Sequence, residues 1–291
     1  MTVQNLGSIN AEAIKRFSTG LFHLDWVYGY NEENNQKTWG IPVGTISMWA
    51  GRSGSGKSRL AVEMAKSLCK QGKKVLYIQN EEPVPIFRAK VNDDNDLQVQ
   101  KLFYVSDAST LQGQIDDIMK CEPDLVIIDS INEVEDFGGG YKTNVQRMIN
   151  GESDNPGYNY RFVCNNIGCH IVLLNQMNSD DTIKGGTSLI HLVDMVFDIK
   201  YLEINSVFVI ICERKNRYGK VGDLIYTAWQ HLDIGVIPYK VQNKYFLSDT
   251  KNINIDNKTT YIDKYDQGKR PWGEVALEGF FDFFWFLKPK N

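Results

Sequence analysis

Short apolar runs alternate with segments whose apolar residues recur at helical spacing over most of the chain. The expected strands lie at 45–50, 74–79, 102–105, 125–128 and 170–176. The expected helices lie at 60–68, 83–91, 111–119 and 158–167. This alternation is typical of a mostly parallel central sheet with helices on both faces. The sequence therefore predicts an α/β protein.

The pattern changes after residue 194, where strand-like segments follow one another with short connections. These segments lie at 195–202, 206–212 and 224–229. Neighbouring strands joined by short connections pair antiparallel, so they are expected to close one edge of the sheet. Between the two patterns, residues 131–157 are rich in Gly, Asn, Asp and Glu, which predicts a long loop with a helical piece at 145–149.

A glycine-rich octapeptide follows the first strand and fits the pattern G-x-x-x-x-G-K-[ST]. In such a loop the backbone N–H groups converge on a phosphate at a helix N-terminus. Lys57 would reach the β- and γ-phosphates, and the hydroxyl of Ser58 is placed to bind Mg²⁺. The residues expected to bind ATP are Gly51, Arg52, Ser53, Gly54, Ser55, Gly56, Lys57, Ser58 and Arg59.

A second element of the same site is predicted at the end of the strand 125–128. This apolar run ends in Asp129. In phosphate-loop proteins an aspartate at this edge of a parallel sheet holds the Mg²⁺ ion. Ser58 and Asp129 are therefore the expected metal-binding residues.

Composition limits the possible partners and compartments. The 291 residues carry a formal net charge of −4, so any nucleic-acid binding must come from local loops. No apolar stretch reaches the roughly 18 residues that cross a membrane, and no leader pattern opens the chain. We expect a cytoplasmic protein without membrane contact. The five cysteines do not form a zinc pattern and are expected to be buried free thiols.

Several stretches resemble the RecA-type ATPase core, most closely that of the RadA/Sms branch, which is related to DnaB-type helicases and KaiC. The segment 17–25 is similar to the branch's Ser-Thr-Gly…Leu-Asp pattern, and 41–44 to its Pro-Gly step. Residues 75–82 match the second strand, which ends in Glu-Glu, and 185–194 match a Gly…Leu-Glu-His…Val-Asp segment. Lys-Asn-Arg-Tyr-Gly at 215–219 is close to the branch's Lys-Asn-Arg-Phe-Gly signature.

The resemblance implies roles for residues outside the phosphate loop. Glu81 would orient or deprotonate the attacking water, with Glu82 as the alternative. Gln176 would sense the γ-phosphate. Lys215 and Arg217 would reach the ATP of a neighbouring subunit, which implies a homo-oligomer, as a ring or a filament.

The resemblance covers about residues 15–235 and divides the chain. We expect an N-terminal extension at 1–16, a RecA-like core at 17–237 and a C-terminal extension at 238–291. The zinc module and the protease-like domain of the RadA branch have no counterpart in the sequence. The aromatic-rich end at 280–286 would pack in the core or a subunit interface, or bind a protein partner.

The sequence therefore favours an ATP-hydrolysing oligomeric motor on single-stranded DNA, either a helicase-type motor or a RadA-like recombination ATPase, with hydrolysis at subunit interfaces. Lys142, Arg147 and Lys184 in the loops 131–157 and 177–187 would contact DNA phosphates. Acidic residues in the same loops oppose this interpretation. The alternative is a KaiC-like regulatory ATPase that acts on a protein partner. A small-molecule kinase is a third, weaker interpretation, because it would leave Lys215 and Arg217 without a role.

Overall fold

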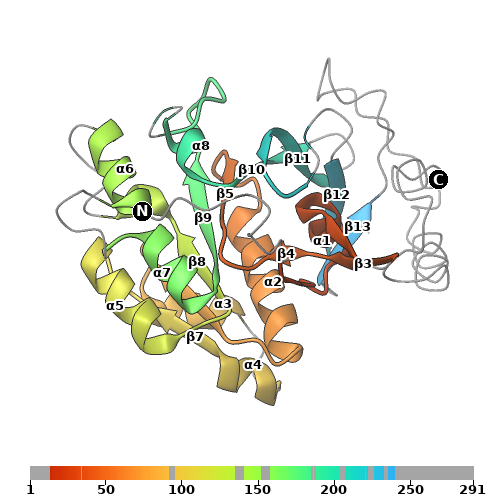
Figure 1. Ribbon diagram of the computed structural model, residues 1–291, viewed down its shortest axis with the longest axis horizontal. Helices are drawn as coiled ribbons and strands as arrows, with labels where there is room; N and C mark the ends of the chain where they lie inside the picture. The colour runs from red at the N-terminus through yellow and green to blue at the C-terminus, as the bar shows by residue number, and fades with distance from the viewer. Residues whose placement is uncertain are drawn as a thin grey trace, which may run out of the picture.

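The computed structural model describes residues 14–33, 35–91, 96–134, 141–151, 158–184, 186, 188–202, 207–219, 221, 226–232 and 235–239. Over these residues the fold is built on a nine-stranded sheet with the order β13-β12-β11-β10-β5-β9-β8-β6-β7 (Figure 1). The strands β5 (Ile46–Gly51), β6 (Val75–Gln79), β7 (Phe103–Ser106), β8 (Leu125–Asp129) and β9 (His170–Gln176) run parallel.

One edge of the sheet is antiparallel, as predicted. β10 (Met195–Leu202) pairs parallel with β5, and β11 (Val207–Asn216), β12 (Tyr226–Leu232) and β13 (Gly235–Tyr239) follow antiparallel. The strand expected at 206–212 continues to Asn216, so Lys215 lies within it. β13 was not predicted. The remaining residues of the C-terminal extension, 240–291, lie outside the described part of the chain, so the aromatic-rich end stays an expectation.

Helices cover both faces of the sheet, as predicted. Alternate residues of each strand face opposite sides, so the apolar strands contribute to a buried cluster on each face. Trp49 belongs to one buried cluster and Met48 to the other. The first cluster includes residues of α1 (Phe22–Tyr28), α2 (Lys57–Lys70), α3 (Val84–Val91) and α4 (Leu97–Leu102). The second includes residues of α5 (Leu111–Cys121), α6 (Tyr141–Asn150), α7 (Tyr160–Ile167) and α8 (Ser188–Leu192).

The region before the phosphate loop forms two small sheets that the hydrophobic pattern does not predict. β1 (Arg16–Phe17) pairs with β4 (Ile41–Pro42), and β2 (Tyr30–Glu33) pairs with β3 (Gln36–Trp39). The Ser-Thr-Gly…Leu-Asp segment is held by Asp25, whose carboxylate accepts bonds from the Ser18 hydroxyl at 2.5 Å and the Thr19 amide at 2.7 Å. Burial raises the pKa of Asp25 to about 6, although these hydrogen bonds lower it.

The expectation of buried free thiols is confirmed except at Cys121, which is only half-buried. All five cysteines are free, and four of them are buried. Within the described ranges no cluster of side chains could hold a metal ion through His, Cys, Asp and Glu alone. In the same ranges no helix is both long enough and apolar enough to cross a membrane.

Candidate nucleotide-binding site

The glycine-rich loop joins β5 to α2 with the geometry expected of a phosphate loop. Gly56, with a φ of 87°, stands directly before the first residue of α2. Gly51 packs so closely on β10 that a Cβ atom there would lie 2.4 Å from the Ile199 carbonyl oxygen. Side chains at these two positions would strain the backbone or displace the loop. The loop therefore presents its backbone at the start of α2, where anions bind.

The side chain of Lys57 is hydrogen-bonded to the backbone of the phosphate loop. Its ammonium group donates to the carbonyl oxygens of Gly51 at 2.8 Å and Arg52 at 3.0 Å. Burial lowers the pKa of Lys57, whereas the negative charges of Asp129 and Glu81 raise it. The two carboxylates thus favour the charged form of a lysine that has lost most of its water.

The two expected metal-binding residues meet at the end of β8. Burial raises the pKa of Asp129, and hydrogen bonds with Tyr77 and Ser58 oppose this rise. The Tyr77 hydroxyl donates to Asp129 Oδ2 at 2.6 Å. Tyr77 is not predictable as a site residue from the sequence, because an aromatic residue within an apolar strand gives no sign that its hydroxyl reaches the neighbouring strand.

Glu81 and Gln176 contact each other across the carboxyl edge of the sheet. The Gln176 side-chain amide donates to Glu81 Oε1 at 3.2 Å, and the Gln176 backbone amide donates to Asn132 Oδ1 at 2.7 Å. Glu82 instead forms an ion pair with Lys90 of α3. The adjacent glutamates therefore differ: Glu81 faces the expected γ-phosphate sensor and Glu82 faces a helix.

Buried polar atoms without hydrogen-bond partners gather around the same edge. They are Ser55 Oγ, Gln79 Oε1, both side-chain polar atoms of Asn80, Ser130 Oγ, Asn132 Nδ2 and Asn175 Oδ1. An unsatisfied buried polar group costs about 1–3 kcal/mol, so such a concentration is typical of a site that a polar ligand or ordered water completes. Together with the loop amides, Lys57, Ser58 and Asp129, these donors and acceptors fit a nucleoside triphosphate with Mg²⁺.

Other predicted residues lie around this centre. Arg52 donates to Asp181 Oδ1 at 2.8 Å and to the Ser179 carbonyl at 2.7 Å, so its guanidinium faces the loop after β9. Arg59 is exposed on α2, and Ser53 and Gly54 are exposed at the tip of the phosphate loop.

The expected DNA-binding residues lie on α6 and next to β9. Lys142 and Arg147 are on α6, and the side chain of Lys142 lies outside the described residues. The backbone of Lys184 is bonded to Gln176 and Asn175. Of the three, Lys184 is therefore directly connected to the end of the sensor strand.

Lys215 and Arg217 lie at the opposite end of the sheet. Arg217 is bonded through its amide to the Asp194 carbonyl, and the Asp194 amide is bonded to the Ile46 carbonyl. Arg217 is thus level with the first residue of β5, five residue steps or about 17 Å from Gly51 at the rise of a strand. Lys215 Nζ donates to the carbonyls of Ile190 and His191 at the end of α8.

The turn at 215–219 is fastened to α1 by the other residues of its motif. Asn216 Nδ2 donates to the Val27 carbonyl at 3.1 Å, and Asn216 Oδ1 accepts from the Tyr218 amide at 3.0 Å. A Cβ at Gly219 would lie 2.9 Å from the Tyr28 carbonyl oxygen. Arg16 also donates to the Tyr218 carbonyl, at 2.5 Å. Asn216 and Gly219 therefore have structural roles that the sequence analysis did not assign.

Comparisons with known proteins agree with this geometry. The AAA domain family matches residues 31–181. "DNA repair protein RadA" of Mycolicibacterium smegmatis is 25% identical over 217 residues, which is 75% of this chain and 44% of that protein. RadA of Aquifex aeolicus is 24% identical over 231 residues, 77% of this chain and 48% of that protein. The chain thus spans less than half the length of these relatives.

A solved structure shares the fold. The crystal structure of a KaiC-like protein from the archaeon Pyrococcus horikoshii superposes with a TM-score of 0.58 at 14% identity, over 78% of this chain and all of that chain. This likeness confirms the predicted architecture, a mostly parallel sheet with antiparallel strands at one edge.

The Tyr77–Asp129 bond gives the first prediction. Replacing Tyr77 by Phe removes a hydrogen bond that lowers the pKa of Asp129, so the carboxylate binds protons better and Mg²⁺ less well. The Mg²⁺ concentration needed for half-maximal nucleotide binding should rise roughly tenfold, and more at pH 6 than at pH 8. Titration of Mg²⁺ against a fluorescent ATP analogue measures this.

Tyr28→Phe is the matched control, because Tyr28 is also fully buried and its hydroxyl lies 3.0 Å from Ser47 Oγ, on the amino-terminal half of β5. An unchanged Mg²⁺ dependence in Tyr77→Phe would show that the hydroxyl does not tune the metal site.

Proposed function

The chain belongs to the AAA domain family and has a RecA-type P-loop ATPase core related to RadA and KaiC, and on this premise we propose that it is an oligomeric motor that hydrolyses ATP between subunits and acts on single-stranded DNA. One observation carries the proposal. The residues that suit ATP hydrolysis are divided between the two ends of β5, so no single subunit brings them together.

The phosphate-loop end supplies binding and water activation. The loop amides and Lys57 would bind the phosphates, and Lys57 would exchange its two carbonyl partners for phosphate oxygens. Mg²⁺, held by Ser58 and Asp129, would neutralise the charge of the β- and γ-phosphates.

Glu81 is the better candidate for the residue that orients the attacking water. Its carboxylate accepts a hydrogen bond from Gln176, and its charge raises the pKa of both Lys57 and Asp129. The ion pair with Lys90 directs Glu82 toward α3. Because Gln176 is bonded to Glu81, a γ-phosphate that attracted the amide of Gln176 would also release Glu81 toward water.

The basic end would act on a neighbouring subunit. Arg217 lies about 17 Å along β5 from its own phosphate loop and two strands across the sheet, beyond the reach of an arginine side chain. Its side chain is 54% exposed. An exposed arginine held at a fixed turn is suited to stabilise charge on a γ-phosphate presented by another copy.

Single-stranded DNA is proposed as the substrate on two grounds. The relatives matched in sequence are named DNA repair proteins. The loop after Gln176 forms a small hairpin, closed by a bridge between Met177 and Ile183, and Lys184 follows this bridge at the end of β9. A lysine in this place can bind a DNA phosphate and respond to movements of Gln176.

The glutamate assignment is tested by two neutral variants. Glu81→Gln should bind ATP with nearly unchanged affinity and reduce kcat by at least about 100-fold, because water activation is lost. Glu82→Gln is the matched control and should keep kcat within about threefold, because this carboxylate faces Lys90. If Glu82→Gln is inactive and Glu81→Gln is not, the assignment is wrong by one residue.

The cross-subunit role is tested by mixing two inactive variants. Lys57→Ala cannot hydrolyse its own ATP but keeps Arg217, whereas Arg217→Ala keeps an intact phosphate loop. Each alone should be nearly inactive, and their mixture should regain roughly a quarter of wild-type turnover if each site pairs one loop with one neighbour at random. A mixture that stays as inactive as its components would rule out hydrolysis between subunits.

DNA binding is tested at Lys184. Lys184→Ala should weaken single-stranded DNA binding about equally for all sequences and reduce the slope of log affinity against log salt by about one unit. Basal ATPase activity in the absence of DNA provides the internal comparison. The matched control, Lys120→Ala on α5, should leave the slope unchanged. No DNA affinity at about 50 mM salt, where phosphate contacts are strongest, would favour the regulatory alternative with a protein partner.

A further inference from the structure

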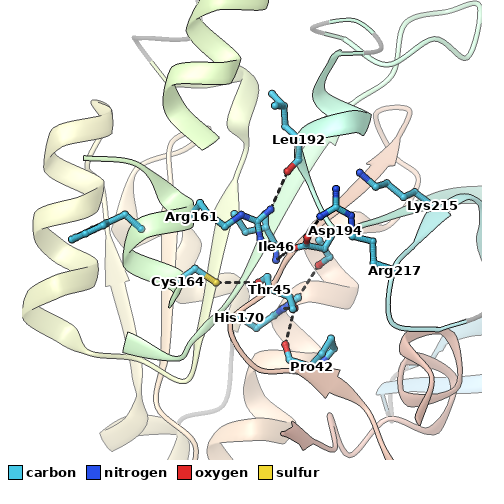
Figure 2. Close-up of polar contacts among 12 residues, drawn as sticks. Pro42, Thr45, Ile46, Arg161, Cys164, His170, Leu192, Asp194, Lys215 and Arg217 are labelled. Atoms are coloured by element: carbon cyan, nitrogen blue, oxygen red, sulfur yellow. Dashed lines mark hydrogen bonds and ion pairs between the residues drawn. The ribbon is translucent and has the colours of Figure 1, made fainter. Parts of the chain in front are cut away.

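We propose that Arg161 is a positioning residue, which frees Arg217 for the neighbouring nucleotide by keeping the buried carboxylate of Asp194 paired when Arg217 leaves it. The inference rests on the proposed function and adds to it a residue outside the Lys-Asn-Arg-Tyr-Gly motif. Arg161 lies on α7, and Figure 2 shows it on the opposite side of Asp194 from Arg217.

Asp194 is fixed between α8 and β10. Its side chain is 2% exposed, and its Oδ2 atom accepts a bond from the Ile46 amide at 2.9 Å. The Asp194 amide donates in turn to the Ile46 carbonyl at 2.8 Å. This carboxylate therefore holds the start of β5 and cannot follow a moving side chain.

Two arginines share the carboxylate unequally. Arg161 binds Oδ2 through Nη1 and the Leu192 carbonyl through Nη2 at 2.9 Å, and its side chain is 23% exposed. Arg217 binds Oδ1 at 3.3 Å through Nη1, and its side chain is 54% exposed. Arg161 is thus held at two points in a partly buried position, and Arg217 makes a longer contact from solvent.

This difference decides what the departure of Arg217 would cost. Removing the partner of a buried charge is strongly unfavourable when the remaining charge has no other partner. With Arg161 and the Ile46 amide in place, Asp194 stays paired after Arg217 has moved. Without Arg161, Arg217 would be the one described cation bonded to Asp194, and the carboxylate would retain it.

The surrounding charge favours the same movement. Burial lowers the pKa of Lys215, the charges of Arg217 and Arg161 lower it further, and the charge of Asp194 raises it. Two arginines are thus paired with Asp194, and the charge of a third cation, Lys215, lies near enough to interact with all three. Arrival of a γ-phosphate from a neighbouring subunit would relieve this repulsion between cations, which favours transfer of Arg217 from Asp194 to the phosphate.

The chain offers a matched control in Arg214. Its Nε donates to both carboxylate oxygens of Asp198, at 3.1 and 2.8 Å, and the Asp198 side chain is also 2% exposed. Arg214→Met therefore removes an arginine from an equally buried aspartate whose described ion pair is with Arg214 rather than Arg217.

The test compares kcat and KM for ATP in the wild-type oligomer and in Arg161→Met, Asp194→Asn, Arg161→Met/Asp194→Asn and Arg214→Met, with melting temperatures alongside. In Arg161→Met, kcat should fall roughly tenfold while KM stays within about twofold, because Arg217 stays on Asp194 and the phosphate loop is intact. The double variant should return kcat to within about threefold of wild type, since a neutral side chain at position 194 no longer retains Arg217. Arg214→Met should lower the melting temperature and leave kcat per folded oligomer unchanged.

Two results would overturn the inference: an unchanged kcat in Arg161→Met, or a double variant as slow as the single one. If Arg161→Met does not fold, Asp194→Asn tests the proposal instead. Asp194→Asn should keep at least wild-type kcat, and adding Arg217→Ala to it should abolish this activity. A kcat of Asp194→Asn below that of wild type rejects the proposal. The mixture of Lys57→Ala and Arg217→Ala subunits distinguishes failure of this inference from failure of the proposed hydrolysis between subunits. Recovery there with no effect of Arg161 rejects this inference alone, whereas no recovery rejects hydrolysis between subunits.

Discussion

The parallel pairing of β5 with β9 on one side and β10 on the other is the constraint on which both parts of the site depend. Because Gly51 is in register with Gln176, the phosphate loop begins beside the expected sensor residue. Because Ser47 is in register with Met195, the start of β5 lies beside Asp194 and the basic turn. A slip of one residue in either pair would turn the buried side chains to the wrong face and move the loop away from Gln176 and Asp129.

Buried charge is concentrated at the two ends of this strand, and each end balances it in its own way. At the phosphate loop, Lys57 and Asp129 lose water and stabilise each other electrostatically, and several polar atoms are left without partners. At the other end, Asp194 is fully bonded by two arginines and a backbone amide. The first arrangement suits binding of a charged ligand, and the second suits a side chain that is held and then released.

The sequence predicted those parts of the molecule that local patterns encode. The apolar runs around Ile46 and Ile171 predict strands, and the glycine-rich loop predicts a turn into a helix; the structure confirms the strands and the turn. The helix α4 and the strands β1 to β4 are too short to show a period, so their formation depends on tertiary packing. Gly40 illustrates this dependence, because a Cβ there would lie 2.3 Å from the Phe17 carbonyl oxygen.

Site residues divide in the same way. Lys57, Ser58 and Asp129 were proposed from a motif and a strand end, and the structure brings them together. Tyr77, Asn216 and Arg161 were not found, because each acts through a partner that is distant in sequence: Asp129, Val27 and Asp194. No local pattern contains such a contact, and it emerges only when the sheet and its helices are assembled.

The assembled fold also connects the two ends through the chain that follows Gln176. The hairpin after β9 is held to the phosphate loop by Arg52, which contacts Ser179 and Asp181. The same segment continues into α8, whose last carbonyls bind Lys215. Arg52 and Asp181 are both about half exposed, and exposed ion pairs contribute only about 0.2–1 kcal/mol, so a phosphate that attracted Arg52 would release the hairpin at little cost. The weak contacts thus lie where the proposed movement would begin, and the strong, buried contacts of Asp194 lie where the proposed role of Arg217 would need a fixed reference.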